Sequence, residues 1–159
     1  MNTNYAGFWL RFVAVIIDGI ILWVIQSFIF VPILAAMGLG FAGAAETMDF
    51  SDPEQAAGMF ASIMALMGGY WILSITLNVI YHTLMEASKF QGSVGKLALG
   101  LRVTDLQGNK LDFVKALVRN LCKLISNFTI LIGYIMAGFT EKKQALHDMI
   151  ASTLVLKKN

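Results

Sequence analysis

The sequence has few charged residues, few prolines and almost no cysteine. Charged residues make up 14% of the 159 positions, against about 25% in a typical soluble protein, and there are two prolines and one cysteine. A lone Cys122 excludes an intramolecular disulfide and a multi-cysteine metal site. Hydrophobic residues make up 57% and the mean hydropathy is +0.69, which argues against a disordered regulator and a soluble α/β enzyme. The composition is that of a membrane protein.

Basic residues are missing from a long part of the chain, and the net charge of +2 hides this asymmetry. Arg11 is the one charged residue among the first eleven. Residues 12–85 contain no lysine or arginine, and their five acids are Asp18, Glu46, Asp49, Asp52 and Glu54. All other lysines and arginines lie in residues 86–159. An apolar, acidic first part followed by a basic second part indicates a membrane protein with defined sides.

Two segments are long enough to cross a bilayer, which takes about 20 apolar residues. We expect the first span at about residues 12–37 and the second at about residues 60–85. The loop between them is acidic, and the segment that follows the second span is basic. The positive-inside rule therefore predicts a protein of the cytoplasmic (inner) membrane with its N-terminus in the cytoplasm.

Residues 113–139 form a third apolar stretch that has two interpretations. Lys115, Arg119 and Lys123 recur every fourth residue, which predicts a basic stripe on one face of a helix. Such a stripe is typical of a helix that lies at the membrane interface. The uncharged remainder is short for a crossing helix, so we favour an interfacial or re-entrant helical hairpin over a third span.

The position of the tail, residues 140–159, supports the same choice. LRVTD (101–105) and STLVLK (152–157) are β-branched and alternating, and they predict two strands. If the strands pair, both lie on the cytoplasmic side, so both termini are cytoplasmic. The predicted fold is an all-α membrane protein in one domain, residues 1–159, with two full transmembrane helices, the hairpin and a small cytoplasmic two-stranded β element.

Local signals place the elements between the spans. Ser93 is a suitable N-cap for a short helix that stops at Gly100. The sequence DLQGNK predicts a turn after the first strand, and Asp112 is a suitable cap for a helix that begins at Phe113.

Asp18 is the most informative residue in the chain. It lies about 10 Å deeper than Arg11 on the same helical face, about a third of the way across the apolar core. A carboxylate at such a depth costs about 2.5–3.5 kcal/mol on insertion scales, so we expect it to face protein or water and to be either paired or protonated. One interpretation is a site that exchanges protons, and the other is a structural ion pair with Arg11 or with another basic group.

The second predicted span carries a polar stripe of Ser74, Asn78, His82 and Glu86, four residues apart. An antiparallel arrangement of the spans would set Asn78 near the depth of Asp18 and Glu86 near Arg11. The stripe is either a path for protons or ions or a set of interhelical hydrogen bonds worth about 0.6 kcal/mol each. For His82 alone the structural interpretation is favoured.

The tail offers little for catalysis. His147 and Asp148 are adjacent, but a metal site needs three or four ligands, and no serine or cysteine is placed with them as a nucleophile. We therefore expect no enzyme, no cofactor and no metal. The basic residues around 89–123 are expected to meet anionic lipid headgroups and not nucleic acid.

Three segments resemble the RDD family of small membrane proteins, which is named for one arginine and two aspartates. They are YAGFWLRFVAVIIDGIIL, QGSVGKLALGLRVTDLQGNKLDFVKALVRNL and QALHDMIASTLVL, and they cover nearly the whole chain apart from residues 38–65. The resemblance places the namesake residues at Arg11, Asp18 and Asp148. It implies a transport role for an unidentified ligand, including cation/proton exchange, and no more.

Two functional hypotheses follow. In the first, a homo-oligomer exchanges monovalent cations for protons, because the helices of one protomer can scarcely enclose a path. Asp18 binds the proton or the cation, Arg11 tunes the pKa of Asp18, and Asp148 holds the tail at the cytoplasmic mouth. The path candidates on the second span are Asn78, His82 and Glu86. The alternative is a non-transporting structural or accessory protein that binds membrane lipids or a partner protein.

Overall fold

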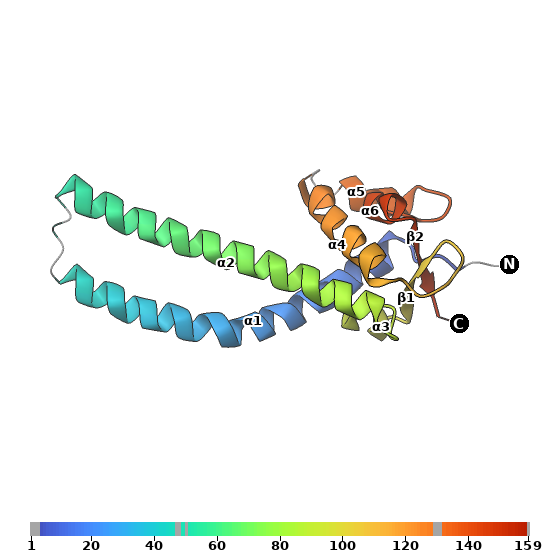
Figure 1. The fold of residues 1–159 in the computed structure, drawn as a ribbon, viewed down its shortest axis with the longest axis horizontal. Helices are drawn as coiled ribbons and strands as arrows, with labels where there is room; N and C mark the ends of the chain where they lie inside the picture. The colour runs from blue at the N-terminus through green and yellow to red at the C-terminus, as the bar shows by residue number, and fades with distance from the viewer. Residues whose placement is uncertain (1–3, 47–48, 50, 129–131, 159) are drawn as a thin grey trace. The chain divides into compact units, whose positions relative to one another are not determined.

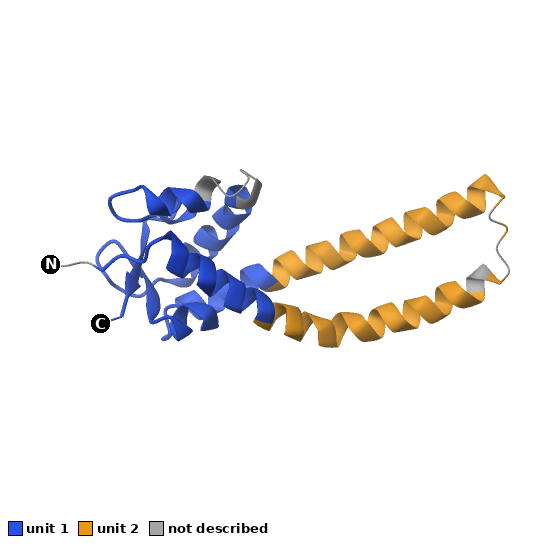
Figure 2. Cartoon of the chain, turned by 180° about the vertical axis from the view of Figure 1, so that it is seen from behind, with its two compact units in different colours: residues 1–20, 78–159 blue, residues 21–77 orange. Residues whose placement is uncertain are grey.

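The protein is mostly helical, with two long apolar helices and a small antiparallel sheet (Figure 1). The structure is a computed structural model that describes residues 4–46, 49, 51–128 and 132–158. The chain divides into two compact units (Figure 2). Unit 1 consists of residues 1–20 and 78–159, and unit 2 consists of residues 21–77.

The two long helices are α1 (Phe8–Ala45) and α2 (Pro53–Ala87), and both extend beyond the predicted spans. The start of helix α2 has the usual sequence signals of a helix N-terminus. The Asp52 carboxylate accepts a hydrogen bond from the Glu54 amide (2.9 Å), and Pro53 occupies the first helical position, where it needs no hydrogen-bond partner.

Both long helices are suited to lipid and not to a protein core. They are long and apolar enough to cross a membrane, and only 11% and 0% of their most apolar stretches are buried within the protein. Within unit 2, the Ser74 hydroxyl donates to Gln26 Oε1 (3.1 Å), and the rings of Phe30 and Tyr70 pack edge to face. Almost all other large side chains of this hairpin remain exposed, as expected when lipid tails surround them.

The sheet in unit 1 confirms both predicted strands. β1 (Leu101–Asp105) pairs antiparallel with β2 (Thr153–Lys157), with Leu101 opposite Lys157. Tyr5 forms an isolated bridge to Leu156 of β2, so the segment before α1 lies against the sheet. The small hydrophobic core around it contains Ala6, Leu101, Val103, Leu111, Ala116 and Val155.

The remaining elements are short. They are α3 (Val94–Ala98), α4 (Phe113–Phe128), α5 (Ile132–Ile135), the 3-10 helix η1 (Met136–Gly138) and α6 (Leu146–Ile150). The Asp112 carboxylate caps α4 by accepting from the Lys115 amide (2.7 Å), as predicted. The predicted turn forms around Asp105, with Gly108 at a φ of +86° that favours glycine. The connection of the predicted hairpin falls on residues 129–131, which lie outside the described residues.

Ser93 precedes α3 as predicted, but its side chain forms no capping hydrogen bond. Ser93 is therefore the N-cap residue of α3 by position, as predicted, and only the capping hydrogen bond of its side chain is absent. The Ser93 hydroxyl donates to the carboxylate of Asp18 instead, because α3 begins directly beside that part of α1.

Helix α4 has its polar face inward and an apolar face outward. Arg119, Asn120 and Ser126 are buried, and the side chain of Lys123 is only 16% exposed. The prediction that the basic residues around 89–123 meet lipid headgroups is wrong for Arg119 and Lys96, which are 1% and 5% exposed, because buried carboxylates attract them into the protein. The outward face carries Val114, Val118, Leu121 and Ile125, all at least 40% exposed.

Candidate functional site

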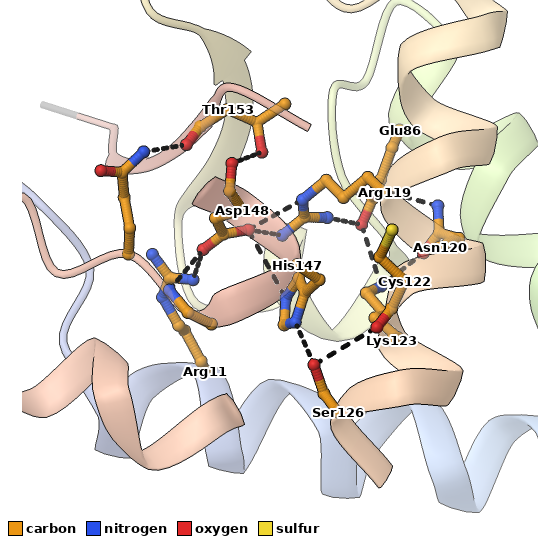
Figure 3. A network of polar contacts seen from close by, with 12 residues as sticks. Arg11, Glu86, Arg119, Asn120, Cys122, Lys123, Ser126, His147, Asp148 and Thr153 are labelled. Carbon is orange, nitrogen blue, oxygen red and sulfur yellow. Dashed lines mark hydrogen bonds and ion pairs between the residues drawn. The ribbon is translucent and has the colours of Figure 1, made fainter. Parts of the chain in front are cut away.

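A buried set of charged side chains joins five helices of unit 1, and Figure 3 shows the part of it around Asp148, Arg119 and Glu86. We call it the ionic cluster. Its members, from α1, α2, α3, α4 and α6, are Arg11, Glu86, Lys96, Arg119, Lys123 and Asp148.

Asp148 is held by two arginines. Arg119 donates to its carboxylate from Nε (2.9 Å) and Nη2 (2.7 Å), and Arg11 donates through Nη1. Burial alone would raise the pKa of Asp148, but the charges of Arg119 and Arg11 outweigh it and hold the pKa well below its usual range. Asp148 therefore stays ionised and joins α6 to α1 and α4.

Glu86 is the second carboxylate of the cluster and is fully buried. Arg119 Nη1 lies 2.6 Å from its Oε1, Lys96 Nζ donates to the same oxygen, and Lys123 Nζ lies at 3.4 Å. Asn120 Nδ2 donates to the other oxygen at 3.1 Å. Arg119 thus bridges both buried acids, a role that suits the fixed fork of a guanidinium.

The ionic cluster contains four basic side chains and two carboxylates. Burial and the neighbouring charges of Lys96 and Arg119 lower the pKa of Lys123 to about 7, although Glu86 opposes them. Burial also lowers the pKa of Lys96, again against the attraction of Glu86. Lys123 is therefore a group that can lose its proton near neutral pH.

His147 lies beside the cluster without adding to its charge. Burial lowers the pKa of His147 well below its usual value, although Asp148 lies 3.5 Å from its Nε2. Its Nδ1 lies 3.4 Å from the Ser126 hydroxyl. The imidazole is therefore neutral at physiological pH and packs against the ring of Tyr134.

Asp18 lies in a second polar site, which we call the Asp18 site. It is 1% exposed, and its Oδ1 accepts from the Tyr81 hydroxyl (3.0 Å) and the Gly95 amide (2.8 Å). Its Oδ2 accepts from the Ser93 hydroxyl at 2.5 Å. All three donors are neutral, and no cation of the described residues lies within ion-pair distance of this carboxylate.

Gly95 allows the close approach that forms the Asp18 site. A Cβ at this position would lie 2.2 Å from the carbonyl oxygen of Ala14, far inside contact distance. Only a residue without a side chain lets the start of α3 pack directly on α1. The backbone amide of Gly95 can then reach the buried carboxylate.

The predicted site residues separate into two groups. Arg11 and Asp18, predicted to act together, lie in different sites, because Arg11 turns to Asp148 and to the carbonyl of Lys143. Glu86 is bridged to Asp148 by Arg119 and forms no described pair with Arg11. Asn78 is exposed and has no described contact with Asp18.

His82 is buried beside Tyr81, with no hydrogen-bond partner for its Nδ1 among the described atoms. The register of α2 brings Tyr81, and not Asn78 or His82, to the carboxylate of Asp18. The polar stripe of α2 therefore does not form one continuous set of contacts in the described part of the chain.

Several residues of these two sites were not predicted as site residues from the sequence. They are Tyr81, Ser93 and Gly95 in the Asp18 site, and Lys96, Arg119, Asn120 and Lys123 in the ionic cluster. The fourfold spacing of Arg119 and Lys123 was a usable signal, since it puts both on one helical face. Among the described residues, no three histidine, cysteine or acidic side chains are placed to hold a metal ion.

This chain is similar over most of its length to one family of proteins. The model of the RDD family matches residues 5–152. The uncharacterized protein YxaI of Bacillus subtilis is 37% identical over 153 residues, which cover 96% of this chain and 97% of YxaI. The uncharacterized membrane protein YteJ of the same organism is 28% identical, over 96% of this chain and 80% of YteJ. No solved structure matches the chain. With its two apolar helices and this match over most of its length, the chain belongs to the RDD family of membrane proteins.

Proposed function

We propose that the protein exchanges a monovalent cation for protons across the cytoplasmic (inner) membrane, with Asp18 binding the two in turn. The observation that carries this proposal is a carboxylate, buried between apolar helices, that receives only neutral hydrogen-bond donors. An ionisable residue in such a place is costly and commonly marks a path for ions or protons.

The chemistry of the Asp18 site suits both ligands. A carboxylate and two hydroxyl oxygens are hard oxygen ligands of the kind that bind alkali and alkaline-earth cations. Rotation of the Tyr81 and Ser93 hydroxyls would turn their oxygen lone pairs toward a bound cation, and protonation of the carboxylate would neutralise it in the other state.

The ionic cluster is a poor place for the cation. Its four basic side chains outnumber its two carboxylates, so a further cation there would be repelled. Lys123 suits a different task, because its lowered pKa lets it accept and release protons near neutral pH. In this proposal Asp18 binds the cation, and Lys123 of the ionic cluster accepts and releases protons.

The proposed membrane arrangement follows from charge and from α4. The basic residues of unit 1 favour cytoplasmic termini by the positive-inside rule. The outward apolar face of α4, with Val114, Val118, Leu121 and Ile125, supports an interfacial position in which this face enters the acyl chains. Two crossing helices enclose little space, so we propose that a homo-oligomer forms the path.

Proteoliposomes with an internal pH dye test the proposal. Adding Na⁺ or K⁺ to vesicles with an imposed pH gradient should dissipate it, and Asp18→Asn should abolish the effect while the protein remains inserted. Glu141→Gln is the matched control, because this acid is exposed. Exchange by Asp18→Asn at the rate of the unaltered protein would remove Asp18 from the mechanism.

The second candidate is a structural or accessory membrane protein without flux, which binds lipid headgroups or a partner protein. The favouring observation is that the donors to Asp18 come from α2, α3 and the residue before α3, so the carboxylate joins these segments to α1. In this case Asp18→Asn should reduce the amount of folded protein in the membrane, and the unaltered protein should show no cation-dependent proton movement.

A further inference from the structure

An apolar groove with a basic side chain at its edge lies beside the start of α1. Its volume is about 380 Å³, within the usual range of small-molecule sites. The lining residues include Phe8, Trp9, Ile135, Ala137, Phe139 and Lys143, so the groove runs between α1 and the segment that contains η1. Trp9 and Phe139 are 74% and 87% exposed.

The backbone of Lys143 is held in a tight turn beside the groove. Its φ of +46° is unusual for a residue with a side chain. Two hydrogen bonds hold this turn: Arg11 Nη2 donates to the Lys143 carbonyl (2.6 Å), and the Lys143 amide donates to the Thr140 carbonyl (2.9 Å). The Lys143 side chain extends over Gly7, where a Cβ would lie 3.9 Å from Nζ.

The ammonium group of Lys143 has no carboxylate of the described residues within ion-pair distance. It is thus a cation at the edge of an apolar groove, at the point where a membrane-spanning helix begins. Exposed aromatic side chains at that level are typical of the zone where headgroups meet acyl chains.

From this placement we infer that the groove binds an anionic phospholipid, with its phosphate at Lys143 and part of an acyl chain against Phe8, Trp9 and Phe139. The negative headgroup complements the cation, and the chain covers aromatic surface that the protein leaves open. The inference is independent of cation exchange, since no residue of the groove belongs to the Asp18 site.

Fluorescence quenching by brominated lipids tests the inference. The background variant Trp23→Phe with Trp71→Phe leaves Trp9 as the one tryptophan, and both replaced residues lie in unit 2. The full chain is placed in nanodiscs that contain either brominated phosphatidylglycerol or brominated phosphatidylcholine. Lys143→Gln removes the cation of the groove, and Lys142→Gln removes a neighbouring exposed charge that does not line it.

In the background variant, Trp9 should be quenched at a lower fraction of brominated phosphatidylglycerol than of brominated phosphatidylcholine. Lys143→Gln should reduce this preference by about fivefold, as for one basic residue at an anionic surface. Lys142→Gln should keep the preference. Equal quenching by the two lipids, or equal effects of the two lysine variants, would overturn the inference. So would protection of Trp9 from both lipids, which would mean that protein, such as a second copy, covers the groove.

Discussion

Unit 1 and unit 2 share the same two long helices but keep them together by different interactions. In unit 2 the described polar contact between α1 and α2 is one hydrogen bond, from Ser74 to Gln26. In unit 1, buried ion pairs join α1, α2, α3, α4 and α6. Lipid tails are as apolar as leucine and provide no hydrophobic drive for helix association. The arrangement of unit 1 therefore depends on charge, whereas the hairpin of unit 2 depends on packing and on the surrounding lipid.

The largest effect is expected from breaking the ionic cluster. Glu86→Gln leaves Arg119, Lys96 and Lys123 without their shared carboxylate, and loss of one partner from a buried ion pair typically costs about 3–5 kcal/mol. Thermal unfolding in detergent should show this loss. Gln26→Leu is the counterpart in unit 2 and should cost about 0.6 kcal/mol. Similar losses for the two variants would contradict the proposed difference between the units.

A smaller effect is expected from Gly95→Ala. The new Cβ would clash with the backbone at Ala14, and forced overpacking typically costs about 1–3 kcal/mol. Gly68→Ala in unit 2 is the matched control, because no described atom outside its own stretch of helix lies within 4 Å of its Cβ position, and alanine favours a helix. Denaturation midpoints should fall for the first variant and stay level or rise for the second. An unchanged midpoint for Gly95→Ala would show that α3 does not pack this closely on α1.

The third effect is a dependence of stability on pH. The pKa of Lys123 is about 7 in the folded protein and near 10.5 when the lysine is free. Between these values the unfolded state binds more protons, so the free energy of unfolding should rise with pH, by up to about 1.4 kcal/mol per pH unit. Below pH 7 both states hold the proton and this contribution to the slope disappears.

Lys123→Met should flatten the rise between pH 7 and 10, when unfolding is followed at several pH values. Lys115→Met on the same helix should leave it unchanged, because Lys115 is exposed. An equal slope in both variants would mean that Lys123 keeps an ordinary pKa.

Much of the local structure follows from the sequence. The strand LRVTD, the Asp112 cap and the turn around Asp105 depend on neighbours in the chain, and all three form as predicted. The two apolar helices also follow, because length and hydropathy determine them. Their ends extend past the predicted spans, since glycines such as Gly38 and Gly43 do not interrupt the end of α1.

The partners of the buried charges could not be derived in the same way. Spacing shows that Arg119 and Lys123 share a face of α4, but not whether this face meets lipid headgroups or Glu86. That choice depends on contacts between distant parts of the chain. The partners of Asp18 could not be derived either. Ser93 and Gly95 reach its carboxylate because α3 docks on α1, and the register of α1 against α2 does not reveal this docking.

The pairing of Arg11 with Asp148 sets an order for folding during synthesis. The two residues are 137 positions apart, so the first helix waits for its carboxylate until α6 has been made. Contacts of such long sequence separation form late and slow the folding reaction. During this interval the exposed apolar helices and the unpaired arginine are open to wrong associations, as in other incompletely folded chains. Assembly of unit 1 is therefore a late event that follows the emergence of α6 from the ribosome.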